Sequence, residues 1–332
     1  MNALELALAA GFEEMPPLWE ESYNCTQEDR ALDNFPFDRS FIDQALSFYR
    51  LENNEILKEQ VYAFLDRILE DVQLQKAVLL IHTIMFQSSF EGYKKLWDWT
   101  RPVNDMLPTV MVLLGHQKHL KSMQKRGFDE TQINDHIEDI HLRLIKAPVL
   151  FGTLGISFGS MVWTGLFQRG EVIQIGSLQY ELNSFYEDLT PTDDIPKKGE
   201  MFIALHIQRN QILTPAAIDD SLNQAPNLIN KYFPETLSVK PLYFACSSWL
   251  LSKQIRPLLP AKSNIKAFQD RFRIFDGNVS EEISSFLFNI VSKDAPIESF
   301  EEKTSLQKAV KKAMLDGTIF HDGIGILKNT KF

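Results

Sequence analysis

Residues 201–217, MFIALHIQRNQILTPAA, combine an apolar run, a histidine, a polar loop and a helix start. The run predicts a strand that ends near His206, and Thr214 and Pro215 are the residue types favoured at the N-cap and first position of a helix. Such a helix turns its unpaired backbone N–H groups and the positive end of its dipole toward the loop, where Arg209 adds a cation. This order is typical of sites that hold a pyrophosphate or another anion, and an ordinary strand-to-helix connection is the alternative.

Two titratable side chains, His206 and Glu181, could act as a general base. Histidine changes its charge near neutral pH, which suits a base or acid in catalysis. In the segment LQYE, residues 178–181, Gln179 and Glu181 share one face of an expected strand because side chains alternate along it. If this face lines a cleft, Glu181 can take a proton from a substrate. The alternatives are a solvent-facing strand side for Glu181 and a packed or hydrogen-bonded role for His206.

Two histidine-containing segments, HQKH at 116–119 and HIEDIH at 136–141, have the residue types of metal ligands. Their spacing does not suit a metal, because His136 and His141 lie five residues apart, roughly 140° around a helix axis. The HExxH motif is also absent. We therefore expect both segments to form polar helix surface, and we predict no metal site.

Two adjacent serines, Ser247 and Ser248, stand at an expected strand–helix junction. A serine nucleophile needs a histidine partner, but the next histidine in the chain is His321 and the GxSxG motif is absent. Helix capping is the more economical use of these hydroxyls. The dinucleotide motif GxGxxG and the phosphate loop GxxxxGK[ST] are absent as well.

The first half of the chain predicts helices, because its apolar residues recur three and four positions apart. Gly127 has the residue type of a helix end, and Asp129 with Gln132 forms a capping box at the next helix start. No strand pattern precedes about residue 165. The expected helices cover residues 39–51, 54–72, 105–124 and 130–146.

The second half alternates strand and helix patterns. Gly176 interrupts the alternating segment 171–185 and marks a bulge or turn. Thr304 and Gln307 form the capping box of the last helix, and Gly317 ends it. The expected strands are 171–175, 177–185, 201–207, 241–248, 273–277 and 318–328, and the expected helices are 214–233, 249–259, 263–272, 280–291 and 304–317.

These patterns predict an α+β chain of two domains, an all-helical N-terminal domain over residues 1–150 and a mixed-sheet domain over residues 151–332. The segment 147–167 carries no charge and is long enough to span a bilayer. Pro148, four glycines and several hydroxyl side chains dilute its hydrophobicity. We therefore expect a buried junction between the domains, and we regard membrane contact as the alternative.

Charge and cysteine content exclude several classes of protein. The 34 Lys and Arg against 44 Asp and Glu leave a net charge of -10, which disfavours nucleic-acid binding. Cys25 and Cys246 lie far apart and make neither a metal spacing nor a disulfide framework. The start of the chain carries Glu5 and lacks the basic region of a signal peptide. We expect a cytoplasmic protein, and the oligomeric state is not indicated.

Five segments, read in order, resemble a family of bacterial two-domain N-acyltransferase-like proteins, which have a helical N-terminal domain and a C-terminal domain related to the GNAT acyltransferase fold. The segments are KRGFDETQINDHIEDI, QIGSLQYEL, ALHIQRNQILTPAAIDDSL, FACSSWLLSKQIRPLLPAKSNIKAFQDRF and TSLQKAVKKAMLDG. The resemblance implies a GNAT-like mixed-sheet α/β domain that binds acyl-CoA, such as acetyl-CoA, in a splayed sheet. It further implies transfer of the acyl group from the CoA thioester to a small-molecule amine, which is not identified.

The resemblance also implies roles for individual residues. Acyl transfer to an amine needs a base, donors for the oxyanion and an acid for the leaving thiolate. Glu181 and His206 are the expected bases, and Tyr243 is the expected acid. The residues expected to bind the cofactor are Ile207, Arg209, Gln211, Leu213, Thr214, Ser247 and Ser248.

Three departures from the family pattern bear on activity. Family members read HIPEGGPLTP where this chain reads HIQRNQILTP, and they carry His-Ser-Trp where this chain has Ser247, Ser248 and Trp249. An arginine of the family is replaced by Ser177. A catalytically inactive binding or scaffold protein on the same fold is therefore the alternative function. A hydrolase that uses Ser247 or Ser248 is a third reading.

Overall fold

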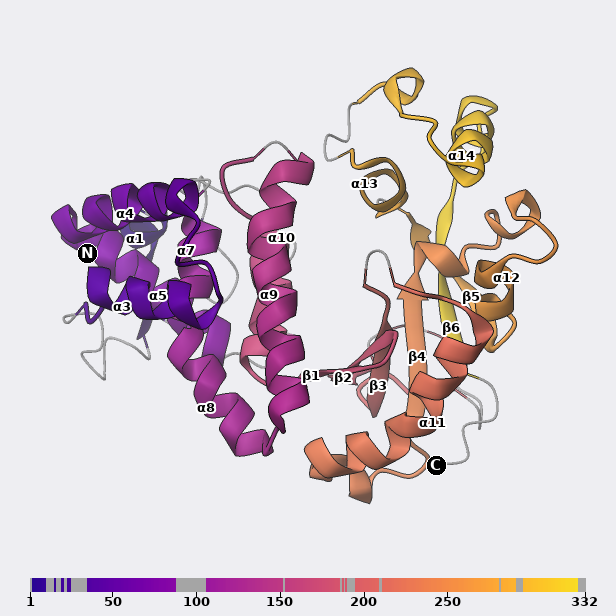
Figure 1. Ribbon diagram of the computed structural model, residues 1–332, viewed down its shortest axis with the longest axis horizontal. Coiled ribbons are helices and arrows are strands. Elements are labelled where there is room, and N and C mark those ends of the chain that lie inside the picture. Colours follow the sequence, from indigo (N-terminus) through magenta and orange to yellow (C-terminus); the bar gives the residue numbers. More distant parts are fainter. Residues whose placement is uncertain are drawn as a thin grey trace. The chain divides into compact units, whose positions relative to one another are not determined.

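The computed structural model divides the chain into two compact units, Met1–Glu171 and Val172–Phe332. The first unit is helical, and the second is built on a six-stranded sheet (Figure 1). This confirms the predicted α+β fold class. The structure describes residues 2–9, 15, 19–20, 23–24, 35–87, 106–151, 153–185, 187, 189, 195–208, 211–280, 282–290 and 295–327.

The helices of the first unit bury the apolar faces that their sequence periodicity predicts. In α4, for example, Leu57, Val61 and Leu65 are buried on one side of the helix. The helix bounds are α1 Ala3–Ala9, α3 Arg39–Phe48, α4 Glu55–Glu70, α5 Val72–Gln87, α7 Leu107–Leu114, α8 His116–Arg126, α9 Glu130–Phe151 and α10 Phe158–Gln168.

The helix expected over residues 105–124 is interrupted at Gly115, and α8 continues to Arg126. A Cβ atom at Gly115 would lie 2.5 Å from the side-chain oxygen of Gln168, so only glycine admits this close approach. The Gln168 amide donates hydrogen bonds to the Val112 carbonyl at 2.7 Å and to the Tyr49 hydroxyl at 2.8 Å. Gly115 thus lies against Gln168 of α10, which is far along the chain.

The two units divide after Glu171, whereas the sequence placed the domain boundary after residue 150. The helix α10 lies between these two positions and packs on α5, α7, α8 and α9. Most of its residues are buried, which accounts for the absence of charge in this part of the chain. Among the described residues, no helix is long and apolar enough to cross a membrane.

The sheet of the second unit has the strand order β1-β2-β3-β4-β6-β5 and is mixed. Only β3 and β4 pair in parallel, and the other neighbours are antiparallel. Gly176 has a φ of 55° in the two-residue turn between β1 and β2, so the predicted interruption is a hairpin turn. The strand bounds are β1 Val172–Ile175, β2 Leu178–Ser184, β3 Met201–His206, β4 Tyr243–Ser248, β5 Phe272–Val279 and β6 His321–Leu327.

The parallel pair β3–β4 separates before its strands end. Paired residues run from Phe202 with Tyr243 to Ala204 with Ala245. Beyond this point β3 continues to His206 and β4 continues to Ser248. The last residues of the two strands are therefore not paired with each other.

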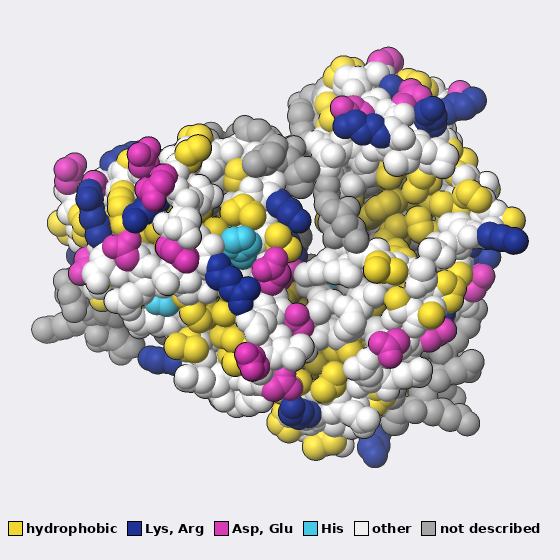
Figure 2. Space-filling view, in the orientation of Figure 1, with side chains coloured by type: hydrophobic (Ala, Val, Ile, Leu, Met, Phe, Trp, Pro, Cys, Tyr) yellow, Lys and Arg dark blue, Asp and Glu magenta, His cyan; other side chains and the backbone are white. Residues whose placement is uncertain are grey.

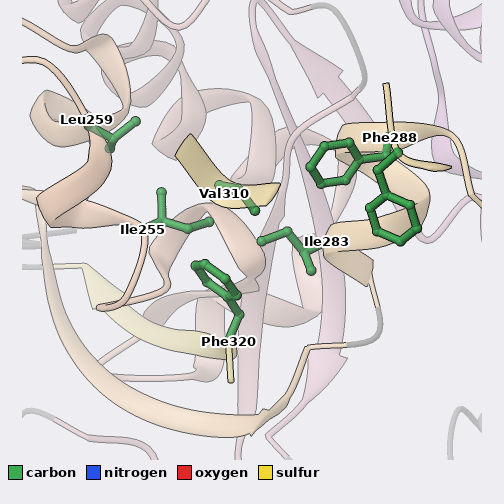
Figure 3. Packing of buried hydrophobic residues seen from close by; sticks show 7 residues of the cluster. Ile255, Leu259, Ile283, Phe288, Val310 and Phe320 are labelled. Atoms are coloured by element: carbon green, nitrogen blue, oxygen red, sulfur yellow. The ribbon is translucent and has the colours of Figure 1, made fainter. Parts of the chain in front are cut away.

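Helices of the second unit cover one face of this sheet and extend its hydrophobic core. The Tyr180 hydroxyl lies 2.9 Å from the Ser221 hydroxyl of α11, which places α11 over the face that carries Tyr180. A second group of buried side chains, including Ile255, Ile283 and Phe320, joins α13 and α14 to the loop after β4 (Figure 3). The remaining bounds are α11 Pro215–Tyr232, α12 Asn264–Gln269, α13 Glu282–Phe288 and α14 Ser305–Leu315, with 3-10 turns at η2 Pro234–Ser238, η3 Trp249–Leu251, η4 Arg256–Leu258 and η5 Ile297–Ser299.

Candidate functional site

Glu181 and His206, the two predicted bases, lie in contact. His206 Nε2 and Glu181 Oε2 are 2.6 Å apart. Glu181 pairs with Ala204 across β2 and β3, and His206 follows Ala204 by two positions, so both side chains lie on the same face of the sheet. The Glu181 side chain is 3% exposed and that of His206 is 29% exposed. The carboxylate is thus the inner member of the pair, and the imidazole is the member that a substrate can reach.

The other Glu181 oxygen is held by Asn183, which the sequence analysis did not single out. Asn183 Nδ2 donates to Glu181 Oε1 at 2.9 Å, and the Ser184 backbone N–H donates to Asn183 Oδ1 at 2.7 Å. Gln179, Glu181 and Asn183 are all buried. The alternative of a solvent-facing strand side is therefore wrong. The sequence signal for Asn183 was its position two residues after Glu181 on the same strand face.

The pair lies near the end of β3, which precedes α11 in the chain. The Thr214 hydroxyl accepts a hydrogen bond from the Ala217 backbone N–H at 3.4 Å, which confirms the predicted N-cap. Thr214 is exposed, and no acidic side chain lies in the first turn of α11. This helix start therefore carries the positive end of the helix dipole and no nearby negative side chain in its first turn.

Two described glutamines between His206 and Thr214, Gln208 and Gln211, contact each other. Gln211 Nε2 donates to Gln208 Oε1 at 2.7 Å. Ile207, Gln211 and Leu213 are half-buried. Arg209, the predicted loop cation, lies outside the described residues.

Ser247 and Ser248 lie at the same edge of the sheet, on the strand that separates from β3. Ala245 pairs with Ala204, so Ser247 and His206, each two residues further along, lie on the same face of their strands. Ser247 is exposed. The Ser248 hydroxyl accepts the Leu250 backbone N–H at 3.2 Å, which is the predicted capping role.

Tyr243, the expected acid, lies at the opposite end of β4. It pairs with Phe202, four residues before His206, and this separation along the strands is about 13 Å. Its half-buried ring packs against the cluster of Phe202, Ala204 and Ala245. The structure therefore does not bring Tyr243 together with Glu181 and His206.

Arg271 supplies a cation near the start of α11 that the sequence analysis missed. Its guanidinium lies 2.6 Å from Asp219 and 3.3 Å from the Pro215 carbonyl oxygen. No local pattern indicates this contact, because Arg271 is separated from Asp219 by 52 positions. Only the packing of α11 beside α12 brings the two residues together.

The histidines of the two segments are buried except for His141, which is half-buried, so the expectation of polar helix surface is wrong for His116, His119 and His136. The Tyr49 hydroxyl lies 3.2 Å from His119 Nδ1, and His119 Nε2 lies 3.2 Å from His136 Nδ1. Burial lowers the pKa of His119 well below its ordinary value, and the neighbouring histidines lower it further. Among the described residues, no group of three or more His, Cys, Asp or Glu could hold a metal ion.

Three comparisons with known proteins bear on this site. Residues 172–327 match the family model described as the GNAT-like C-terminal domain. The match spans almost the whole of the second unit. A comparison with curated proteins finds no match.

Among solved structures, the chain resembles an acyltransferase variant in complex with octanoyl-CoA, with a TM-score of 0.74, 19% identity and 99% of each chain covered. It also resembles an acyltransferase in complex with CoA and 10C-teicoplanin, with a TM-score of 0.73, 19% identity and 99% of each chain covered. A complex with decanoyl-CoA and teicoplanin gives a TM-score of 0.72 at 19% identity, over 98% of this chain and 99% of that one. The chain thus shares the fold of these proteins over nearly its whole length, as the resemblance predicted.

Proposed function

We propose that this protein is an acyl-CoA-dependent N-acyltransferase that transfers an acyl group from a CoA thioester to a small-molecule amine. The observation that carries the proposal is the Glu181–His206 pair at the carboxyl edge of β3, where β3 and β4 separate. The GNAT-like domain match and the acyl-CoA complexes of similarly folded proteins support it. We also propose that the protein acts in the reducing cytoplasm, because Cys246 is a free, buried thiol.

In the proposed reaction, the amine nitrogen attacks the thioester carbonyl, the new C–N bond forms and the C–S bond breaks. His206 takes the proton from the attacking amine, and the buried Glu181 carboxylate stabilises the imidazolium that results. The CoA sulfur leaves as a thiolate and needs a hydrogen-bond donor. We assign this contact to the hydroxyl of Ser247, near the end of β4, because Tyr243 lies at the other end of that strand.

The start of α11 is the proposed cradle for the CoA pyrophosphate. Its first turn carries no acidic residue, and the positive end of the helix dipole lies there. Ile207, Leu213 and Thr214 flank this position, which supports their expected place in the cofactor site. The fit rests on the charge and exposure of the helix start, which favour an anion.

Calorimetric titration with CoA, acetyl-CoA, octanoyl-CoA and decanoyl-CoA tests the proposal. We expect binding near micromolar concentrations. An assay of free CoA thiol released with a panel of amines then tests turnover, and His206→Ala should bind CoA normally but release no thiol. A folded protein that binds none of these ligands at millimolar concentration would refute the proposal.

A catalytically inactive acyl-CoA-binding protein on the same fold is the second candidate. The observation that favours it is the hydrogen bond between Gln208 and Gln211 in the loop where proteins of the resembled family carry glycines. Binding of acyl-CoA without thiol release for any amine tested would favour this candidate. Thiol release that depends on both the amine and His206 would exclude it.

A further inference from the structure

Four residues of β2 and β3 form a continuous chain of hydrogen bonds that ends at the proposed base. It runs from the Ser184 backbone N–H to Asn183 Oδ1 at 2.7 Å, and from Asn183 Nδ2 to Glu181 Oε1 at 2.9 Å. It continues from Glu181 Oε2 to His206 Nε2 at 2.6 Å. Asn183 and Glu181 are buried, so these partners replace water.

The groups in this series of hydrogen bonds fix which atom of each pair is the donor. A backbone N–H can only donate, so the Asn183 atom that it contacts is the carbonyl oxygen. The amide nitrogen of Asn183 then faces Glu181 and donates to it. A carboxylate only accepts, so its second oxygen requires a donor from His206 Nε2.

We infer that Asn183 is a positioning residue that sets the tautomer of His206 through Glu181. With the proton held on Nε2, the neutral imidazole carries its lone pair on Nδ1. Nδ1 is then the nitrogen that takes the proton from the acceptor amine. This inference rests on the proposed function only in the use that is made of Nδ1, because the tautomer follows from the hydrogen bonds alone.

Asn183 matters because a carboxylate with one partner can rotate. Without the Asn183 amide, Glu181 Oε1 is a buried acceptor with no donor from this side chain, and Glu181 must turn to find another. The His206 ring then loses its fixed orientation. We expect kcat to fall roughly tenfold to a hundredfold in Asn183→Ala, with the dissociation constant for CoA unchanged.

Nitrogen-15 NMR of the histidine side chains tests the tautomer without any turnover. In the wild-type protein at neutral to alkaline pH, we expect the His206 signals to show a protonated Nε2 and an unprotonated Nδ1. The signals of His206 are identified as those that are lost in His206→Gln. Asn183→Ala should give a mixture of tautomers. Asn183→Asp keeps the shape of the side chain but cannot donate a hydrogen bond, so it should also give a mixture of tautomers. This variant replaces Asn183→Ala in the test should the alanine variant not fold.

Ser184→Ala is the matched control, because it removes the neighbouring side chain but keeps the backbone N–H that begins the chain. It should leave the His206 tautomer and kcat unchanged. A wild-type His206 with its proton on Nδ1, or Asn183 variants with an unchanged tautomer, would overturn the inference. Absence of thiol release in the wild-type protein, with the expected tautomer present, would instead count against the proposed function alone.

Discussion

The buried histidines of the first unit make its stability depend on pH. His82 is buried on α5 between the rings of Phe37 and Phe86, and Lys118 lies near it. Burial lowers the pKa of His82 to about 3, and the charge of Lys118 acts in the same direction. Below its ordinary pKa, a histidine of the unfolded chain binds a proton that the folded unit does not bind. The free energy of unfolding therefore falls as the pH falls.

The magnitude follows from the two pKa values of His82. With an unfolded value of about 6.5 and a folded value of about 3, lowering the pH from 7 to 5 costs about 2 kcal/mol. For a unit of this size, that corresponds to a fall in Tm of roughly 4–8 °C. His116 and His119 add to the effect, because burial lowers the pKa of each.

The second unit should respond in the opposite direction. Burial and, to a smaller extent, the neighbouring Asp322 carboxyl raise the pKa of Glu282 to about 7. The folded unit therefore binds a proton at a pH where the unfolded chain does not, which adds stability as the pH falls. The two units should differ in the sign of this dependence.

Differential scanning calorimetry at pH 7 and pH 5 measures the effect, and hydrogen exchange by mass spectrometry assigns each transition to a unit. In His82→Phe, the first unit should lose about 2 kcal/mol of its pH dependence, whereas His321→Gln in the second unit should not change it. Equal stability of the first unit at both pH values, or an unchanged pH dependence in His82→Phe, would show that burial of His82 does not control this stability.

Three further predictions follow from the second unit. Glu181→Gln should lower the transfer rate at least tenfold with an unchanged circular dichroism spectrum, and an unchanged kcat would remove Glu181 from the mechanism. Thr214→Glu should weaken CoA binding in calorimetry by repelling the pyrophosphate, and Thr304→Glu, at the N-cap of α14, is its matched control; equal affinities in both variants would place the cofactor elsewhere. Gly323→Ala should reduce the free energy of unfolding by about 1–3 kcal/mol in urea titration. The Cβ atom added at Gly323 would lie 2.2 Å from the Leu251 carbonyl oxygen. An unchanged urea midpoint would show that η3 can move away without loss of stability.

The sequence alone was enough to predict the class of the fold and most elements of the second unit. The helix expected over residues 249–259 was wrong, because this segment forms two 3-10 turns, η3 and η4. The strand over residues 201–207 and the Thr214 cap were predicted correctly because strand alternation and capping depend on neighbours a few positions away. The capping box of Thr304 and Gln307 is local in the same sense, and both of its hydrogen bonds are present. Such signals are written within a few residues of the structure that they specify.

Contacts between side chains that are far apart in the sequence could be seen only in the tertiary structure. Glu181 and His206 are 25 positions apart, and their contact exists because β2 and β3 pair in the register that sets Glu181 opposite Ala204. The same holds for the burial of His119 and His136, whose segments read as polar surface but pack against each other from α8 and α9. Register and helix packing depend on the fit of whole elements, so no pattern within a single segment records them.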